Sequence, residues 1–304
     1  MPSQDRLSEV FKSAPQLKFS ESDKFILFSD CHRGDNSWAD DFANNQALFF
    51  YALEFYYREG FTYIEIGDGD ELWENRDFGE IRKAHSHIFW LLRQFYQEKR
   101  LHLIWGNHDM ERSDPRKVQQ TLYHYYNERT GQEEPLFEGI AVHEGLILRL
   151  TGTGNRLFLV HGHQVDPISE RWWRLSRFFV RHFWRHLQLL GINDPTSPAK
   201  NYRKRSTIDA RLAAWVKTKG QILVAGHTHR PRLPRKGEPL YLNTGSCVHP
   251  RCITGIEIAT GEIRLIKWWI RPDQTAYLQV TREVLESIEL GALFRLRAAS
   301  LSRD

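Results

Sequence analysis

Five short apolar runs, each ending in polar residues or glycine, constrain the fold of this chain more than any other feature. They lie at residues 24–30, 62–68, 101–107, 156–162 and 221–227. Their length and their content of Ile, Leu, Val and Phe are typical of buried β-strands. Helical patterns separate the first of these runs, so we expect an α/β fold. In open α/β sheets the carboxyl ends of the strands bind ligands, and here those ends carry polar residues.

The remaining segments predict further helices and a C-terminal β region. Helices are expected at residues 40–60, 78–100, 114–131 and 281–299. After residue 235 the pattern turns to strands, and the sequence ATGE is a candidate hairpin turn. We expect one domain over residues 1–280, with a helical insertion at about 166–218, and then a helical tail over residues 281–304.

The composition excludes several classes of protein. The chain has 304 residues, of which 41% are hydrophobic and 13% aromatic, and this is enough for a packed core. It has no apolar run of about 18 residues and no N-terminal stretch like a signal peptide, so we expect a cytoplasmic protein. Three cysteines are too few for a disulfide framework. A net charge of +4 does not by itself indicate a nucleic-acid partner.

Each of the five strand ends carries a carboxylate, an imidazole or a carboxamide. In chain order, these candidate metal ligands are Asp30, His32, Asp68, Asn107, His161, His227 and His229. A single histidine in a chain with 14 of them is usually a surface or core residue, but an ordered series at strand ends indicates a metal site. Mixed oxygen and nitrogen ligands without thiolate suit Mn²⁺, Fe or Zn²⁺.

The ordered motifs D-x-H, G-D, G-N-H-D, H and G-H-x-H resemble those of the calcineurin-like metallophosphoesterase superfamily, over residues 25–246. The resemblance implies a four-layer αββα sandwich, in which two mixed β-sheets are flanked by helices and hold two divalent metal ions at one edge. Mn²⁺ is the expected metal. The resemblance also implies two ligand sets that share Asp68: Asp30, His32 and His229 for one metal, and Asn107, His161 and His227 for the other.

Such a site implies hydrolysis of a phosphoester. Two cations about 3.5–4 Å apart activate a water and bind the phosphoryl oxygens. His108 is not needed as a ligand because Asn107 fills that place, so we expect His108 to give a proton to the leaving oxygen. We expect Asp109 to orient His108, as a carboxylate orients a catalytic imidazole. A plain surface histidine is the alternative for His108.

Two details resemble the UDP-2,3-diacylglucosamine pyrophosphohydrolases, the lipid A branch of this superfamily. Glu71 and Trp73 follow Asp68 with the spacing GD-x-x-[DE]-x-W, and residues 143–166 resemble a hairpin that leads to a metal-binding histidine in that branch. The branch typically has G-N-R-D where this chain has His108, and HGD where it has HGHQ. A nucleotide-lipid substrate is therefore one expectation. A surface acid and a packing aromatic are the alternatives for Glu71 and Trp73.

The predicted insertion contains a helix at residues 170–190 with arginines on one side. At about 100° per residue, most of its Trp, Phe and Leu residues fall on the other side. Such a helix is a candidate lid over the substrate, or a peripheral contact with an anionic membrane at the inner membrane face. The candidate substrate contacts are Arg33, Arg174, Arg177 and Arg181. An ordinary amphipathic helix on the core is the alternative.

Other functions use the same residue types. A phosphomonoesterase, a serine/threonine phosphoprotein phosphatase and a nuclease are alternatives to the pyrophosphohydrolase. A nuclease would track a single strand with arginines and aromatic residues, but the modest net charge makes nucleic acid an unexpected partner. A scaffold without activity would be expected to lack ligands, and this chain keeps all seven. We predict an enzyme with a phosphoester substrate and no protein partner.

Overall fold

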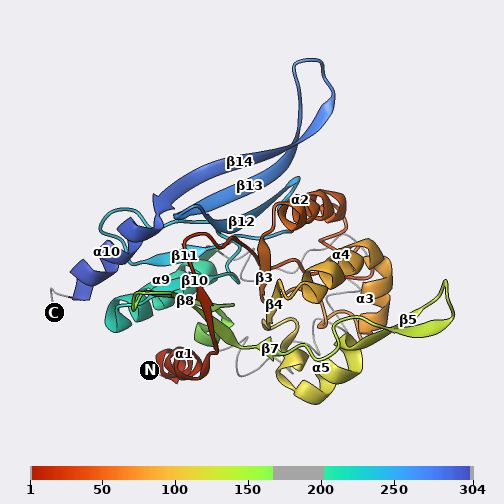
Figure 1. The fold of residues 1–304 in the computed structure, drawn as a ribbon, viewed down its shortest axis with the longest axis horizontal. Coiled ribbons are helices and arrows are strands. Elements are labelled where there is room, and N and C mark those ends of the chain that lie inside the picture. Colours follow the sequence, from red (N-terminus) through yellow and green to blue (C-terminus); the bar gives the residue numbers. More distant parts are fainter. Residues whose placement is uncertain (1, 167–201, 302–304) are drawn as a thin grey trace.

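Two mixed β-sheets form the centre of the computed structural model, which describes residues 2–166 and 202–301 (Figure 1). The first sheet has the order β1 (Gln16–Phe19), β8 (Gly145–Leu150), β9 (Arg156–Val160), β10 (Ile222–Ala225) and β11 (Tyr241–Asn243). The second has the order β14 (Leu278–Glu289), β13 (Glu262–Pro272), β12 (Cys252–Ala259), β2 (Phe25–Phe28), β3 (Thr62–Ile66), β4 (Leu101–Ile104) and β7 (Val142–His143). A separate hairpin pairs β5 (His124–Asn127) with β6 (Gln132–Pro135).

Helices cover the outer faces of the two sheets. They are α1 (Pro2–Ser13), α2 (Gln46–Arg58), α3 (Phe78–Ala84), α4 (Ser86–Gln97), α5 (Pro115–Leu122), α9 (Tyr202–Lys219) and α10 (Leu290–Leu301). Along β2, Ile26 belongs to the apolar cluster shared with α2 and α4, whereas Leu27 belongs to the cluster shared with the five-stranded sheet, α1 and α9. This alternation is that of a strand covered on both faces. The predicted four-layer αββα sandwich is therefore confirmed.

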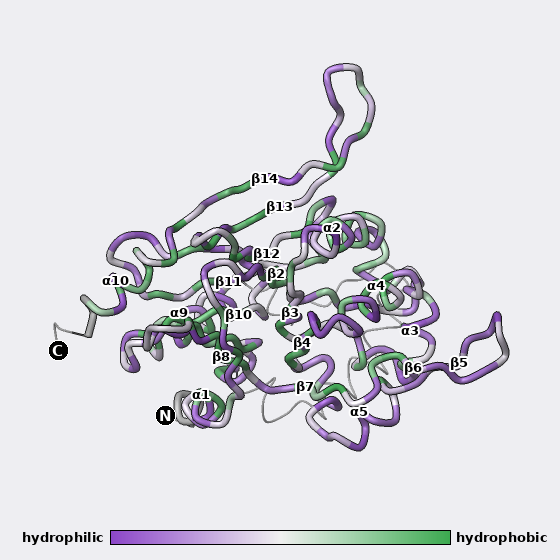
Figure 2. The backbone as a smooth tube through the Cα atoms, in the orientation of Figure 1, coloured by the Kyte–Doolittle hydropathy of each residue, from purple (hydrophilic) through white to green (hydrophobic). Residues whose placement is uncertain are grey.

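The five strands predicted from apolar runs are all present, as β2, β3, β4, β9 and β10. The hydrophobic stretches of strands such as β4 and β8 lie in the middle of the molecule (Figure 2). β2, β3 and β4 pair in parallel, and so do β9 and β10. Within each of these groups the carboxyl ends therefore meet at one edge of the sheet. The ATGE turn also joins a hairpin as predicted, between β12 and β13.

Three predicted helices differ from the structure. The 78–100 segment forms two helices, because the chain breaks at the buried His85, whose Nε2 lies 2.8 Å from Asp40 Oδ2. The helix predicted at 114–131 ends at Leu122, and its second half is β5, whose aromatic residues favour a strand. The helix predicted at 281–299 is wrong up to Glu289, since β14 pairs there with β13; only α10 is helical.

The helical insertion predicted at about 166–218 lies partly outside the described residues. Its C-terminal part is α9, and the predicted helix at 170–190 falls on residues that the structure does not describe. Within the described ranges, none of the helices has the length and apolar character needed to span a bilayer.

Two partly buried histidines on neighbouring strands predict a pH-dependent stability. His102 on β4 has a lowered pKa because of burial and the nearby His143 on β7, and burial lowers the pKa of His143 as well. An unfolded histidine has a pKa of about 6.5, so below that pH each of these two histidines binds protons more readily in the unfolded chain than in the folded one. We expect these two histidines to lower the free energy of unfolding as the pH falls from 7 to 5, so His102→Gln should lose less stability over this range than the unmodified protein.

Urea unfolding at a series of pH values, with a chelator present, measures this slope. His124→Gln is the matched control, because His124 is exposed on the β5–β6 hairpin. An identical slope in His102→Gln and in the unmodified protein would contradict the assignment.

Candidate metal centre

The seven predicted metal ligands lie beyond the carboxyl ends of five strands. They are Asp30 and His32 after β2, Asp68 after β3, Asn107 after β4, His161 after β9, and His227 and His229 after β10. The two sheets are joined at this edge, since the N–H of His227 donates to Asp30 Oδ2 at 3.0 Å. Residues nearly two hundred positions apart are thereby brought into one site.

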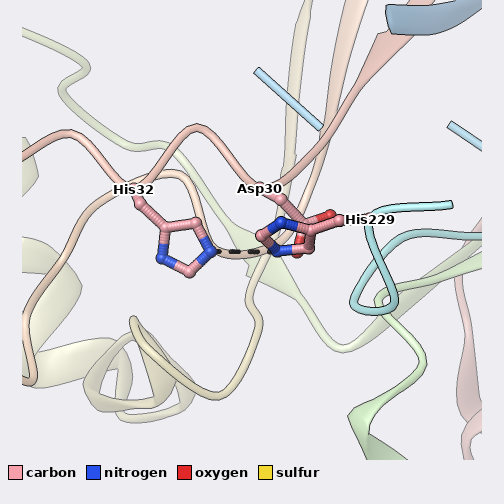
Figure 3. Close-up of side chains that lie close together, drawn as sticks. All are labelled: Asp30, His32 and His229. Carbon is pink, nitrogen blue, oxygen red and sulfur yellow. Dashed lines mark ion pairs between the residues drawn. The ribbon is translucent and has the colours of Figure 1, made fainter. Parts of the chain in front are cut away.

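Six of these ligands form two triads. The first consists of Asp30, His32 and His229, and the second of Asp68, His161 and His227. In each triad the donor atoms all lie within 4.8 Å of one another. Figure 3 shows the first triad, whose side chains come from two different sheets. The two triads divide these six residues as the expected ligand sets do, and a third group of candidate donors, His32, Glu71 and His108, shares His32 with the first triad.

The distances between donor atoms fit the coordination of cations. His229 Nε2 lies 3.0 Å from Asp30 Oδ1, and His161 Nε2 lies 3.1 Å from Asp68 Oδ2. Two donors about 2.1 Å from one ion are about 3.0 Å apart at a right angle and about 3.4 Å apart at the tetrahedral angle. His32 Nε2 is 3.8 Å from Asp68 Oδ2, so Asp68 approaches both triads. A carboxylate that bridges two metal ions has to lie between the two sets of ligands, as Asp68 does.

Four buried donor atoms in the site have no hydrogen-bond partner among the described residues. They are the Nε2 atoms of His32, His161 and His227 and the Oδ1 atom of Asn107. Leaving a buried polar atom unsatisfied costs about 1–3 kcal/mol. Carboxylate oxygens lie near two of these atoms, 3.1 Å from His161 Nε2 and 3.5 Å from His227 Nε2, and a cation between such donors would satisfy all four atoms. The residues present therefore fit a divalent metal site.

Hydrogen bonds on the far side of two imidazoles direct their Nε2 lone pairs into the site. His161 Nδ1 lies 2.9 Å from the carbonyl oxygen of Ile66, and therefore donates to it. His32 Nδ1 lies 2.9 Å from Glu71 Oε2. A proton held at Nδ1 leaves Nε2 as the metal-binding atom, which is the usual arrangement of histidine ligands.

Five of the ligands have a left-handed backbone. The φ angles are 52° for Asp30, 48° for His32, 51° for Asp68, 65° for His227 and 53° for His229. This region is sparsely populated by residues other than glycine and costs about 1–3 kcal/mol for each. Hydrogen bonds between loops offset the cost; for example, the N–H of His32 donates to the carbonyl of Asp68. The backbone thus holds the side chains toward the site.

Opposite charges in the triads shift the pKa values of the ligands. Burial alone would raise the pKa of Asp68, but His161 and His108 hold it well below its usual value. Burial alone would lower the pKa of His32, and Glu71 and Asp68 instead raise it to about 10. The pKa of His161 is likewise raised to about 9, chiefly by Asp68. Since a metal binds neutral imidazole, a divalent cation held by these residues would take the place of the protons.

Comparison with protein families matches residues 23–231 to the calcineurin-like phosphoesterase model. This match covers more than half of the chain and includes all seven ligands. The chain belongs to the calcineurin-like phosphoesterase family. It is accordingly a metal-dependent hydrolase of phosphoesters. No curated protein matches the chain.

Two solved structures are similar to this calcineurin-like phosphoesterase. Vps29 from Chaetomium thermophilum has 11% identity and a TM-score of 0.42, over 89% of this chain and 98% of that one. A putative 5'-nucleotidase from Staphylococcus aureus has 15% identity and a TM-score of 0.36, over 92% of this chain and 58% of that one. Both likenesses are too distant to transfer a function.

His108 of this calcineurin-like phosphoesterase lies at the mouth of the site. Its Nδ1 is 2.8 Å from Glu71 Oε1, its ring stacks on Trp73 with centroids 4.2 Å apart, and its N–H donates to Asp68 Oδ1. Glu71 therefore holds both His108 and the ligand His32. The sequence signal for Glu71 is its place three residues after Asp68, which by itself indicates only a resemblance to the lipid A branch.

Asp109 does not hold His108 as predicted. Its carboxylate accepts hydrogen bonds from the backbone N–H groups of Gly69 and Gly106. Burial raises its pKa to about 6. Asp109 thus ties the loop after β3 to the loop after β4, and this keeps Asp68 and Asn107 close together. The carboxylate that contacts the imidazole of His108 is that of Glu71.

Arg33 is placed in a buried ion-pair network rather than at the mouth of the site. Only 1% of the residue is exposed, and its guanidinium donates to Glu65 at 2.7 and 2.8 Å and to Asp70 at 2.7 Å. Arg112 also pairs with Asp70. A contact with substrate would need an exposed guanidinium. The other predicted contacts, Arg174, Arg177 and Arg181, lie outside the described residues.

Removing Arg33 is expected to destabilise the fold strongly. Arg33→Ala would leave the carboxylates of Glu65 and Asp70 buried with fewer partners, and breaking a buried ion pair costs about 3–5 kcal/mol. The free energy of unfolding in urea measures the loss. Arg58→Ala is the control, because Arg58 forms an exposed pair with Glu54, and such pairs contribute about 0–1 kcal/mol. Equal losses in both variants would contradict the network's role.

Proposed function

We propose that this phosphoesterase binds two divalent cations and hydrolyses a phosphodiester or pyrophosphate bond. The observation that carries the proposal is the position of Asp68, with one carboxylate oxygen 3.1 Å from a donor of the second triad and 3.8 Å from a donor of the first. Mn²⁺ is the expected metal, because nitrogen and oxygen donors without thiolate suit it, with Fe and Zn²⁺ as alternatives.

The residues of this chain divide the work of hydrolysis. When bound, the cations supply an activated water and neutralise charge on the phosphoryl group. Asp30, Asp68 and Asn107 hold the donor geometry, and Glu71 keeps the proton of His108 at Nδ1. The Nε2 edge of His108 then delivers a second proton to the leaving oxygen. Trp73 fixes the plane of the imidazole by stacking on it.

A nucleotide-lipid with a pyrophosphate bond is the proposed substrate class. Support comes from the spacing of Asp68, Glu71 and Trp73, which resembles that of UDP-2,3-diacylglucosamine pyrophosphohydrolases. His108, where that branch typically has arginine, argues for a wider range of leaving groups. Phosphomonoesters, phosphoproteins and nucleic acids are the alternative substrates.

Parallel assays with Mn²⁺ separate these substrates. We expect release of UMP from UDP-2,3-diacylglucosamine, and also cleavage of bis-p-nitrophenyl phosphate. Turnover of p-nitrophenyl phosphate or of a phosphopeptide, without UMP release, would replace the proposed substrate by a phosphomonoester. Salt-sensitive cleavage of single-stranded DNA would indicate a nuclease. Asp68→Asn serves as the inactive control in each assay.

A further inference from the structure

The hairpin of β13 and β14 extends beyond its sheet as a two-stranded arm (Figure 1). The neighbouring strand β12 begins at Cys252, which pairs with Trp269. Beyond Trp269, β13 therefore has β14 as its partner but no longer β12. Pairing between β13 and β14 continues past this point, with Ile270 opposite Val280 and Pro272 opposite Leu278. We call residues 270–280 the arm.

One face of the arm is apolar. Directly opposed residues of an antiparallel pair lie on the same face, and alternate residues share that face. The register therefore places Ile270, Pro272, Leu278 and Val280 on one face, in line with the buried Trp268. Ile270 is 42% exposed and Leu278 is 76% exposed, and Tyr277 beside them is 74% exposed. These are large apolar side chains held in solvent.

The turn at the tip is ordered by Asp273. Its carboxylate accepts hydrogen bonds from the backbone N–H groups of Thr275 and Tyr277, and from the side chains of Thr275 and Gln279. The single acid of the arm is thus engaged within the turn. Because the turn is fixed, Tyr277 and Leu278 are presented at a defined place.

Two cations lie beside Trp269, on the other face of the hairpin. Lys267 Nζ lies 4.3 Å from the ring centroid of Trp269, and the Arg271 guanidinium lies 5.6 Å from it. Trp269 and Arg271 belong to the face opposite Ile270 and Leu278. The arm therefore carries the exposed Ile270, Tyr277 and Leu278 together with the cation Arg271, and Trp269 lies at its base.

The arm projects from the edge of the sheet that carries the metal ligands. β12 runs antiparallel to β2, with Ile256 opposite Leu27, so Cys252 lies at the carboxyl end of β2 where Asp30 follows. β13 is two strands from β2, which is about 10 Å. The tip lies four residues past Trp269, or about 13 Å beyond this edge. The tip of the arm and the metal ligands of the loop after β2 therefore lie beyond the same edge of the seven-stranded sheet.

We propose that the arm docks on the surface of an anionic phospholipid bilayer. Leu278 and Ile270 enter the apolar boundary, Tyr277 and Trp269 lie at the level of the headgroups, and Arg271 contacts lipid phosphates. Docking holds the metal centre over the bilayer, and it does so whatever phosphoester the site hydrolyses.

Sedimentation of the full chain with vesicles tests the proposal. We expect binding to vesicles of phosphatidylglycerol and phosphatidylcholine that is at least tenfold stronger than binding to pure phosphatidylcholine, and that weakens in high salt. The double variant Tyr277→Ser, Leu278→Ser should lose at least tenfold in binding. Tyr126→Ser is the matched control, because Tyr126 is a 56% exposed aromatic on the β5–β6 hairpin, and it should bind as the unmodified protein does.

Hydrolysis of bis-p-nitrophenyl phosphate and the thermal midpoint should be unchanged in the double variant, which shows that it folds. Absence of binding to anionic vesicles, or equal binding by the double variant, would overturn the proposal. A concentration-dependent dimer that the double variant abolishes, without vesicle binding, would assign the apolar face to a second copy of the chain. Because vesicle binding needs no turnover, this test fails or succeeds separately from the proposed hydrolysis.

Discussion

Asp68→Asn is expected to lower kcat by about 10³-fold or more and to reduce the bound metal. Asparagine keeps the shape of the side chain and an oxygen that can accept a hydrogen bond from the N–H of His108. It removes the negative charge of Asp68, which belongs to the second triad and approaches the first. Metal ions contribute several kcal/mol of charge stabilisation to phosphoryl transfer, and each 1.36 kcal/mol is a factor of ten in rate. Metal content by mass spectrometry and kcat on bis-p-nitrophenyl phosphate are the two measurements.

Asp77→Asn is the matched control for this change. Asp77 caps α3 at the surface by accepting from the N–H of Gly79, and asparagine caps helices about as well as aspartate. The control should keep full activity and metal. If Asp68→Asn also kept both, Asp68 would not be a ligand and the proposed two-metal site would be wrong.

His108→Ala is expected to lower kcat by about 10²–10⁴-fold, which is the range for loss of a general acid, while metal content stays unchanged. His108 contacts Glu71 and Trp73 through its side chain, and its backbone N–H, which donates to Asp68, is retained in the variant. The loss should shrink for esters of p-nitrophenol, because that leaving group departs without a proton. It should be largest for alkyl and nucleotide esters.

Glu71→Gln separates orientation from metal binding. Glu71 contacts both His108 and the ligand His32, so this variant should lose activity together with some metal, whereas His108→Ala should lose activity alone. Loss of metal in His108→Ala would make His108 a ligand and remove its assigned role as acid. A loss that is the same for good and poor leaving groups would contradict proton donation.

Periodicity and strand-end chemistry were enough to predict the five central strands and the polar side chains that gather beyond their carboxyl ends. Short apolar runs form buried strands because both faces of such a strand carry apolar side chains, which are stable only when covered. Parallel pairing then brings the carboxyl ends of neighbouring strands to one edge of the sheet. The same reasoning fails at residues 124–127 and 281–289. There the sequence is compatible with either a helix or a strand, and cross-strand partners in β6 and β13 decide the outcome.

The partner of His108 could not be found from the sequence by proximity. Asp109 is its neighbour in the chain, but consecutive side chains leave the backbone in different directions, and Asp109 turns to the N–H groups of Gly69 and Gly106. Glu71 is 37 residues away and reaches His108 only because β3 and β4 are paired. Spacing within a motif predicts the candidate ligands, whereas the carboxylate that contacts His108 depends on tertiary structure.

The left-handed backbone at five of the predicted ligands limits which residue types can occupy these positions, and so which metals the site can bind. Apart from glycine, the residues that best tolerate positive φ are asparagine, aspartate and histidine, which are also oxygen and nitrogen donors. Cysteine at Asp30, His32 or Asp68 would bring a soft donor but would meet the full strain of the loop. The backbone conformation therefore restricts these positions to residues with oxygen and nitrogen donors. Such donors favour hard and borderline cations over soft ones.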